Sequence, residues 1–262
     1  MKLKLILLFS LYTLVSFSKG GYKHYGNNAK AGHYADINGA KIYYETYGKG
    51  TPLLMLHGNG GSIEAFSNQI PFFKKHYKVI AIDSRIQGKS GGSLDTLSYN
   101  MMADDFCTLL DQLHIDSACV LGWSDGGNNA LIMAMKCPEK IIALSVSGVN
   151  VLPDSTALSV EDISGMRNFL DHDSTASLKD KTLTRMMLDQ PQIPFAELSK
   201  IKCPVLVMGG DHDVIKLEHI LKIYQSLPNA QLNIFANSNH GVCQQRPQLF
   251  NKTVLDFFTR KP

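Results

Sequence analysis

Residues 118–127 read ACVLGWSDGG, an apolar run followed by a serine that stands between glycines. The next residues, 128–136, read NNALIMAMK and have the composition of a helix. A G-x-S-x-G pattern between a strand and a helix is typical of a nucleophile elbow, a sharp turn that exposes the serine hydroxyl. The flanking glycines let neighbouring backbone approach the turn. The sequence therefore predicts that Ser124 lies in strained backbone between a strand and a helix.

The apolar run before this turn is one of six in the chain. None of the six alternates with polar residues, which favours strands buried on both faces of a parallel sheet. Helical patterns separate the runs, and this alternation predicts an α/β fold with a mostly parallel, doubly wound sheet. The pair Asn38-Gly39 predicts a preceding hairpin of residues 33–37 and 41–47. The runs are 52–56, 77–82, 118–121, 141–146, 204–208 and 231–235, and the helical patterns are 62–76, 98–113, 126–136, 217–227 and 248–259.

Residues 151–200 interrupt this alternation, because they contain no strand pattern. They hold two helical patterns, at 160–170 and 178–188. An insertion at this place predicts a helical lid over one edge of the sheet. Since the lid is only about 50 residues long, we expect a fairly open site.

The N-terminus has the layout of a secretory signal peptide. Lys2 and Lys4 precede an uncharged stretch, 5–17, and Ser16-Phe17-Ser18 fits a cleavage site. The stretch is short against the roughly 20 residues of a membrane-spanning helix. We therefore expect residues 1–18 to be removed and the protein to be exported, to a periplasm or out of the cell. Residues 19–32 are expected to form a polar leader, and 33–262 a single domain that includes the lid.

Charge and cysteine content exclude some classes of protein. The chain has 26 basic and 23 acidic residues, and no cluster of lysine or arginine that would bind nucleic acid. The five cysteines are scattered and show no metal-binding spacing. We expect most of them to be small buried residues, and an odd number leaves at least one thiol free.

A serine nucleophile needs a base and an acid that orients the base. His240 follows the last apolar run and Asp213 follows the run before it, so both would lie at the carboxyl edge of the sheet, where such sites form. The order Ser124, Asp213, His240 is that of α/β-hydrolase triads. His212 is the rival base and Asp211 the rival acid. The triplet 211–213 also allows a metal site, which we do not expect because no further ligands are evident.

An oxyanion hole requires two backbone amides. We expect them from Asp125, after the nucleophile, and from Asn59, in the loop 57–61 that follows the first central strand. His57 is expected to be a structural part of that loop. The Asp125 carboxylate could favour a substrate ammonium group, or could instead face outward, cap the helix or pair with a cation. Trp123 could line the substrate site or simply pack under the turn.

These motifs together resemble the α/β-hydrolase superfamily over about residues 34–260. The Gly-Trp-Ser-Asp-Gly-Gly turn is similar to that of biphenyl-hydrolase-like and valacyclovir-hydrolase-type esterases, with enol-lactonases and ring-fission C–C hydrolases close to them. The superfamily usually has glycine after the arginine of its D-x-R segment, whereas this chain has Ile86. We therefore expect the backbone of residues 84–90 to differ.

The resemblance implies a serine hydrolase of small carboxylic esters that needs no cofactor or metal. The Asp125 carboxylate beside the nucleophile adds aminoacyl esters as candidate substrates. Lactone or C–C bond hydrolysis by the same three residues is the second interpretation. A third is a catalytically silent member of the superfamily that binds a ligand. Neither the oligomeric state nor the acyl and alcohol groups of a substrate follow from the sequence.

Overall fold

The computed structural model describes residues 24–95 and 97–260. The predicted signal peptide, 1–18, and the first part of the leader lie outside the described residues. An eight-stranded sheet has the order β1-β2-β4-β3-β5-β6-β7-β8. The pairs β1–β2 and β2–β4 are antiparallel and all other pairs are parallel. The predicted mostly parallel sheet is therefore confirmed. The strands are β1 (Gly32–Ile37), β2 (Ala40–Tyr47), β3 (Pro52–Leu56), β4 (Lys78–Ile82), β5 (Ala118–Trp123), β6 (Ile141–Ser147), β7 (Val205–Gly210) and β8 (Ala230–Phe235).

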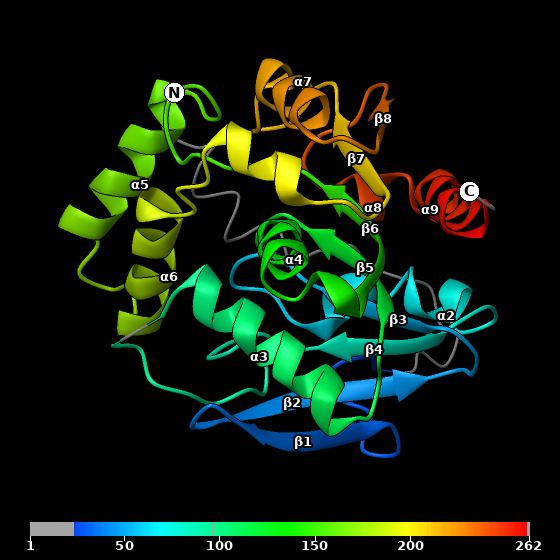
Figure 1. The fold of residues 1–262 in the computed structure, drawn as a ribbon. Helices are drawn as coiled ribbons and strands as arrows, with labels where there is room; N and C mark the ends of the chain where they lie inside the picture. The colour runs from blue at the N-terminus through cyan, green and yellow to red at the C-terminus, as the bar shows by residue number, and fades with distance from the viewer. Residues whose placement is uncertain (1–23, 96, 261–262) are drawn as a thin grey trace.

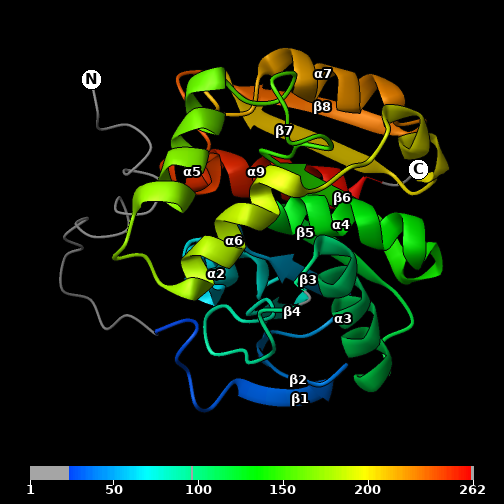
Figure 2. The same ribbon diagram turned by 90° about the vertical axis from the view of Figure 1, so that its left-hand side faces the viewer.

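Helices cover both faces of this sheet, so its central strands are buried on both sides (Figures 1 and 2). Along β3, Leu54 and Leu56 pack into one core, with α3, α4 and α7. Leu53 and Met55 pack into the other core, with α2, α8 and α9. This explains why the strands are continuously apolar. The helices are α2 (Ile70–Phe73), α3 (Tyr99–Gln112), α4 (Asp125–Lys136), α5 (Val160–His172), α6 (Leu178–Asp189), α7 (Leu217–Ser226), α8 (Val242–Gln245) and α9 (Pro247–Thr259).

The predicted hairpin is confirmed at β1 and β2. Asn38 and Gly39 both have positive φ, 47° and 74°, which is the backbone of a two-residue turn that matches the twist of the strands. Asn and Gly adopt this conformation at low cost, so these two residues set the register of the hairpin.

The predicted helix of residues 62–76 is wrong in its length. The structure has a short 3₁₀ helix, η1 (Ile63–Phe66), and then α2, with Pro71 in the first turn of α2. Proline cannot donate the backbone hydrogen bond that a continuous helix needs, so the chain restarts there. Phe66 and Ile70 still pack into the same core.

The predicted polar leader also differs from the structure where it is described. Residues 24–31 pack against β2, since the backbone amides of Gly26 and Asn28 both donate to the Glu45 carboxylate at 2.8 Å. Tyr25 and Ala31 are 9 % exposed. This part of the leader therefore belongs to the folded domain.

The insertion of residues 151–200 forms the predicted pair of helices, α5 and α6, followed by a short 3₁₀ helix, η3 (Phe195–Lys200). Figure 1 shows α5 and α6 beyond the ends toward which the arrows of β4 and β5 point. The lid therefore covers the carboxyl edge of the sheet. Among the described residues, no helix is long and apolar enough to cross a membrane.

Two of the five cysteines form a disulfide. Cys107 in α3 joins Cys137, which follows α4, across a sequence separation of 30 residues. The other three are free, and two of them, Cys119 and Cys243, are buried. The disulfide ties together the two helices that pack beside the predicted nucleophile.

Candidate active site

The elbow at Ser124 has the strained geometry that the sequence predicts. Ser124 has φ 56° and ψ −125°, between the last residue of β5 and the first of α4. Its amide donates to Ser147 O in the neighbouring strand at 2.8 Å. A Cβ atom on Gly126 would lie 2.0 Å from Leu56 O, and one on Gly122 would lie 2.4 Å from Gly126 O. Only glycine fits at both places, so β3, β5 and α4 can approach each other at the turn.

The three predicted triad residues lie together. His240 Nε2 is 2.9 Å from Ser124 Oγ, and His240 Nδ1 is 2.7 Å from Asp213 Oδ1. Asp213 follows β7 and His240 follows β8, so three parallel strands position the set. The Asp213 side chain is fully buried, and Ile215 N also donates to its Oδ1. The geometry is that of a hydroxyl next to a base whose tautomer a carboxylate holds.

Electrostatics in this set favour a charged imidazole ring. Burial lowers the pKa of His240, but the charge of Asp213 and the hydrogen bond to it raise that pKa, and Asp125 adds to them. The pKa of His240 therefore lies above its ordinary value. Burial raises the pKa of Asp213, but the nearby His240 and several hydrogen bonds outweigh burial, so this pKa lies below its ordinary value.

The rival residues lie elsewhere. Asp211 accepts hydrogen bonds from the amides of Asn237 and Ser238 at 2.9 and 3.0 Å, and so fixes the loop before His240. The His212 side chain is 73 % exposed. The described part of the chain contains no group of three or more metal-ligating side chains, the 211–213 triplet included.

Gly148 is a part of the site that the sequence analysis missed. It follows β6 with φ 63°, and a Cβ atom there would lie 2.7 Å from His240 Cε1 and 3.4 Å from Asp213 Oδ2. A side chain at this position would therefore push the ring and the carboxylate apart. The available signal was a glycine two residues after the fourth apolar run, but the contact joins segments about 65 and 90 residues apart in the chain.

The loop after β3 is held by its neighbours. His57 Nε2 accepts a hydrogen bond from Ser84 N at 3.0 Å, so His57 Nδ1 carries the proton and donates to Gly58 O at 2.7 Å. Burial lowers the pKa of His57 to about 4, which keeps the ring neutral. Gln87 Oε1 accepts from Gly60 N at 2.7 Å. His57 thus has the structural role that the sequence predicts.

Ile86 adopts the left-handed conformation that favours glycine, with φ 59°. Isoleucine adopts this conformation at a cost of about 1–2 kcal/mol, and the expected difference of residues 84–90 from the superfamily stays a prediction. The Ile86 side chain is 7 % exposed and packs into the core that contains Tyr99. Ser84 and Gln87, on either side, keep their contacts with the loop after β3.

The side chains of Asp125 and Trp123 have protein partners. The Asp125 carboxylate, in a residue only 6 % exposed, accepts a hydrogen bond from Asn59 Nδ2 at 2.8 Å and another from the Tyr99 hydroxyl. The side chain therefore does not face outward and does not pair with a described lysine or arginine, whereas its contact with a substrate ammonium group stays a prediction. Trp123 is 8 % exposed, and its Nε1 donates to His240 O at 2.8 Å, so it packs under the turn.

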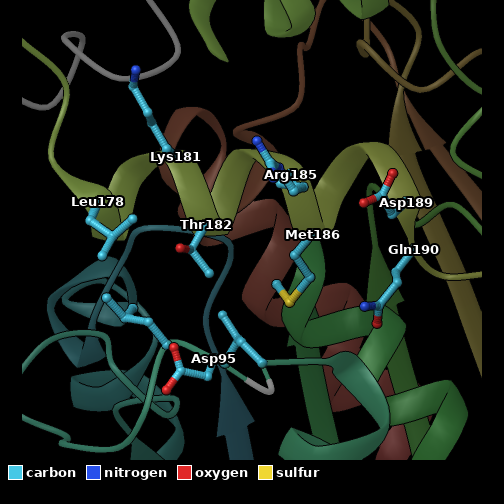
Figure 3. A pocket seen from close by; sticks show the side chains of 10 residues that line it. Asp95, Leu178, Lys181, Thr182, Arg185, Met186, Asp189 and Gln190 are labelled. Carbon is cyan, nitrogen blue, oxygen red and sulfur yellow. The ribbon is translucent and has the colours of Figure 1, made fainter. Parts of the chain in front are cut away.

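The lid reaches the site despite its short length. Leu183 in α6 is fully buried, and its carbonyl lies 3.4 Å from Asn59 Nδ2. A cavity of about 360 Å³ lies between α6 and the segment that contains Leu94, Asp95 and Leu97. Figure 3 shows Thr182 and Met186 pointing from α6 toward this segment, while Lys181 points away. None of the predicted triad residues lines this cavity, and the openness of the site stays a prediction.

The elbow, the parallel sheet and the placement of Asp213 and His240 after successive strands define an α/β hydrolase. A family model described as alpha/beta hydrolase fold matches residues 51–175. Sequence relatives are hydrolases, and the similar solved structures have the same fold. The chain therefore has the α/β-hydrolase fold, and its sequence relatives support a hydrolase.

The relatives act on different substrates. A 2-hydroxy-6-oxononadienedioate/2-hydroxy-6-oxononatrienedioate hydrolase from Comamonas testosteroni is 26% identical over 263 residues, covering 84% of this chain and 92% of the relative. A putative carbamate hydrolase, RutD, from Caulobacter sp. (strain K31) is 26% identical, covering 83% and 96%. The enol-lactonase from Burkholderia xenovorans LB400 has a TM-score of 0.74 at 19% identity, covering 87% and 100%. At this identity the structural likeness shows the fold alone.

Proposed function

We propose that this protein is a serine hydrolase that cleaves small carboxylic esters through an acyl-enzyme intermediate. The observation that carries the proposal is the unbroken hydrogen-bonded line from Asp213 through His240 to Ser124, on an elbow with φ 56°. A buried acid, a base of raised pKa and a hydroxyl at a strained turn are the parts that nucleophilic acyl transfer needs.

In this mechanism Ser124 Oγ attacks the ester carbonyl and gives its proton to His240 Nε2. Asp213 holds the ring by Nδ1 and stabilises the imidazolium. The amides of Asn59 and Asp125 donate to the oxyanion, each contributing about 2.7–4 kcal/mol to the transition state. His240 then protonates the leaving alcohol, and finally activates the water that releases the acyl group. No step requires a metal or an organic cofactor.

Hydrolysis of a lactone or of a C–C bond by the same three residues is the second candidate. The names of the relatives favour it, since they include ring-fission product hydrolases and an enol-lactonase. An acidic ring-fission product would need a cation in the active site. Arg185 lines the cavity beside α6, but none of the predicted triad residues lines that cavity. A carbamate is a further small acyl substrate that a relative's name suggests.

A substrate panel separates these candidates. Wild-type protein and the Ser124→Ala variant would be assayed with p-nitrophenyl acetate and butyrate, an enol-lactone and a 2-hydroxy-6-oxodienoate. The proposal expects kcat/KM highest for the esters, with a burst of nitrophenol before the steady state, and a loss of at least about 10³-fold in the variant. Highest kcat/KM for the lactone or the dienoate would select the second candidate. Activity that survives in the variant would reject both.

We also propose that the protein is exported after removal of residues 1–18. The disulfide Cys107–Cys137 supports this proposal, because disulfides persist in oxidising compartments. Fractionation of expressing cells, with mass spectrometry of the mature N-terminus, tests it. We expect a chain that begins at Lys19 outside the cytoplasm, and an intact Met1 in the cytoplasmic fraction would contradict the proposal.

A further inference from the structure

The Asp125 carboxylate is a buried charge for which the proposed mechanism has no use. Asp125 is 6 % exposed, and none of the described lysine or arginine side chains forms an ion pair with it. Burial raises the pKa of Asp125 above its ordinary value, although its two hydrogen bonds and the nearby His240 act the other way. Burying an unpaired carboxylate costs free energy, so neighbouring polar groups are needed to stabilise it.

Both hydrogen-bond partners of this carboxylate are neutral donors, and both are at least partly buried. Asn59 Nδ2 donates to Asp125 Oδ2 at 2.8 Å, and the Tyr99 hydroxyl donates to the same carboxylate. An ionised carboxylate only accepts hydrogen bonds. The Asp125 carboxylate therefore fixes the orientation of the Asn59 side-chain amide. The flipped amide would place the Asn59 Oδ1 atom against a carboxylate oxygen.

Asn59 belongs to a loop with little stiffness of its own. Glycines stand on both sides of it, at 58 and at 60–61, and Gly60 has φ 67°. Gln87 holds the amide of Gly60. The backbone amide of Asn59 itself has no hydrogen-bond partner among the described residues. The hydrogen bond to Asp125 thus holds Asn59, whose backbone amide is the proposed oxyanion donor.

The lid contacts the same group of residues at two points. Leu183 O in α6 lies 3.4 Å from Asn59 Nδ2. Gln190, directly after α6, accepts a hydrogen bond from the Tyr99 amide through its Oε1 at 3.1 Å. The carboxylate and the lid therefore constrain the Asn59 side chain together.

We propose that the Asp125 side chain is a positioning group that joins the two halves of the oxyanion site. The backbone amide of Asp125 is one donor, and its carboxylate holds Asn59, whose backbone amide is the other. This inference rests on the proposed function. It replaces the expectation of a substrate ammonium beside Asp125, which assigned the same carboxylate to the substrate.

The test compares kcat and KM of wild type, Asp125→Asn, Asn59→Ala and the double variant on one neutral ester. Asp104→Asn is the matched control, since Asp104 is an exposed carboxylate of α3 that pairs with Lys136. An aminoacyl ester, its des-amino analogue and a trifluoromethyl ketone, which forms a tetrahedral adduct, complete the set. Thermal unfolding of each variant reports its folding, and Tyr99→Phe replaces Asp125→Asn if the latter does not fold.

We expect kcat to fall about 10- to 100-fold in each single variant with KM changed less than about threefold, because the loop is misplaced but its amide remains. Affinity for the ketone should fall in parallel with kcat/KM. The double variant should be no worse than the poorer single variant, since Asp125→Asn weakens and Asn59→Ala removes the same contact. The control should match the wild type.

Several results would overturn the inference. Unchanged kcat in Asp125→Asn, or additive losses in the double variant, would show that the side chains of Asp125 and Asn59 do not act together. A selective rise of KM for the aminoacyl ester over its analogue would instead make Asp125 a substrate contact. Absence of Ser124-dependent turnover in the wild type would reject the proposed function and this inference together, and the Ser124→Ala control identifies that case.

Discussion

At the scale of single residues, the reacting groups are easier to predict from the sequence than the groups that position them. Ser124, Asp213 and His240 each follow an apolar run, so parallel strands bring them to one edge. Gly148 could not be predicted in this way, because its role depends on a close approach to a ring and a carboxylate from other strands. The bond between Asn59 and Asp125 is likewise a contact of folded segments 66 residues apart.

Replacing Gly148 by alanine should damage the site more than the fold. The new Cβ would lie 2.7 Å from His240 Cε1, so we expect kcat/KM for an ester to fall by at least about 100-fold as the ring is displaced. Gly39→Ala is the control, since Gly39 also has positive φ but no atom within 4 Å of the added Cβ. The control should lose only about 1 kcal/mol of stability and no activity. Equal kcat/KM for wild type and Gly148→Ala would contradict the assignment.

The pH profile of kcat/KM reports on His240. The ring must be neutral to accept the Ser124 proton, so activity should rise with pH through the pKa of His240. Since Asp213 and Asp125 raise this pKa against the effect of burial, the midpoint of the acid limb should lie above the ordinary value of 6.5. Asp125→Asn removes one of the two charges and should move the midpoint downward. A wild-type midpoint at or below 6.5 would be inconsistent with the described charges.

At the scale of elements, the strands and most helices follow from hydrophobic pattern, and the exceptions have local causes. The predicted helix 62–76 breaks because Pro71 cannot continue it, and the leader packs onto Glu45, a long-range contact. The openness of the site could not be judged from lid length. It depends on how α6 meets the loop after β3, which is visible in the contact of Leu183 with Asn59.

The disulfide between α3 and the end of α4 should contribute strongly to stability. Closing a loop with a sequence separation of 30 residues corresponds to about 3–4 kcal/mol in the chain-entropy account. The double variant Cys107→Ala, Cys137→Ala should therefore show a lower free energy of unfolding by about that amount in equilibrium urea denaturation. Cys203→Ala, which changes a free and partly buried thiol, is the control. Equal free energies for wild type and double variant would show that the disulfide does not form.

At the scale of the whole molecule, the strand order makes the site possible. The elbow follows β5, and the acid and base follow β7 and β8, on the same side of β5 in the sheet. β6 lies between them and ends at Gly148, where only hydrogen fits beside the His240 ring. The lid helices then cover this carboxyl edge (Figure 2). The alternation of strands and helices predicted a mostly parallel sheet with the site at its carboxyl edge, but not the strand order, and the substrate depends on side chains of the lid that no pattern specifies.

The central claim is that Ser124 is an activated nucleophile. Its most direct test is covalent labelling of the mature, folded protein with a fluorophosphonate, with the modified peptide identified by mass spectrometry. We predict one adduct, on Ser124, that is absent in Ser124→Ala and strongly reduced in His240→Ala. Folded wild-type protein that remains unlabelled, or an adduct that persists in Ser124→Ala, would contradict the account.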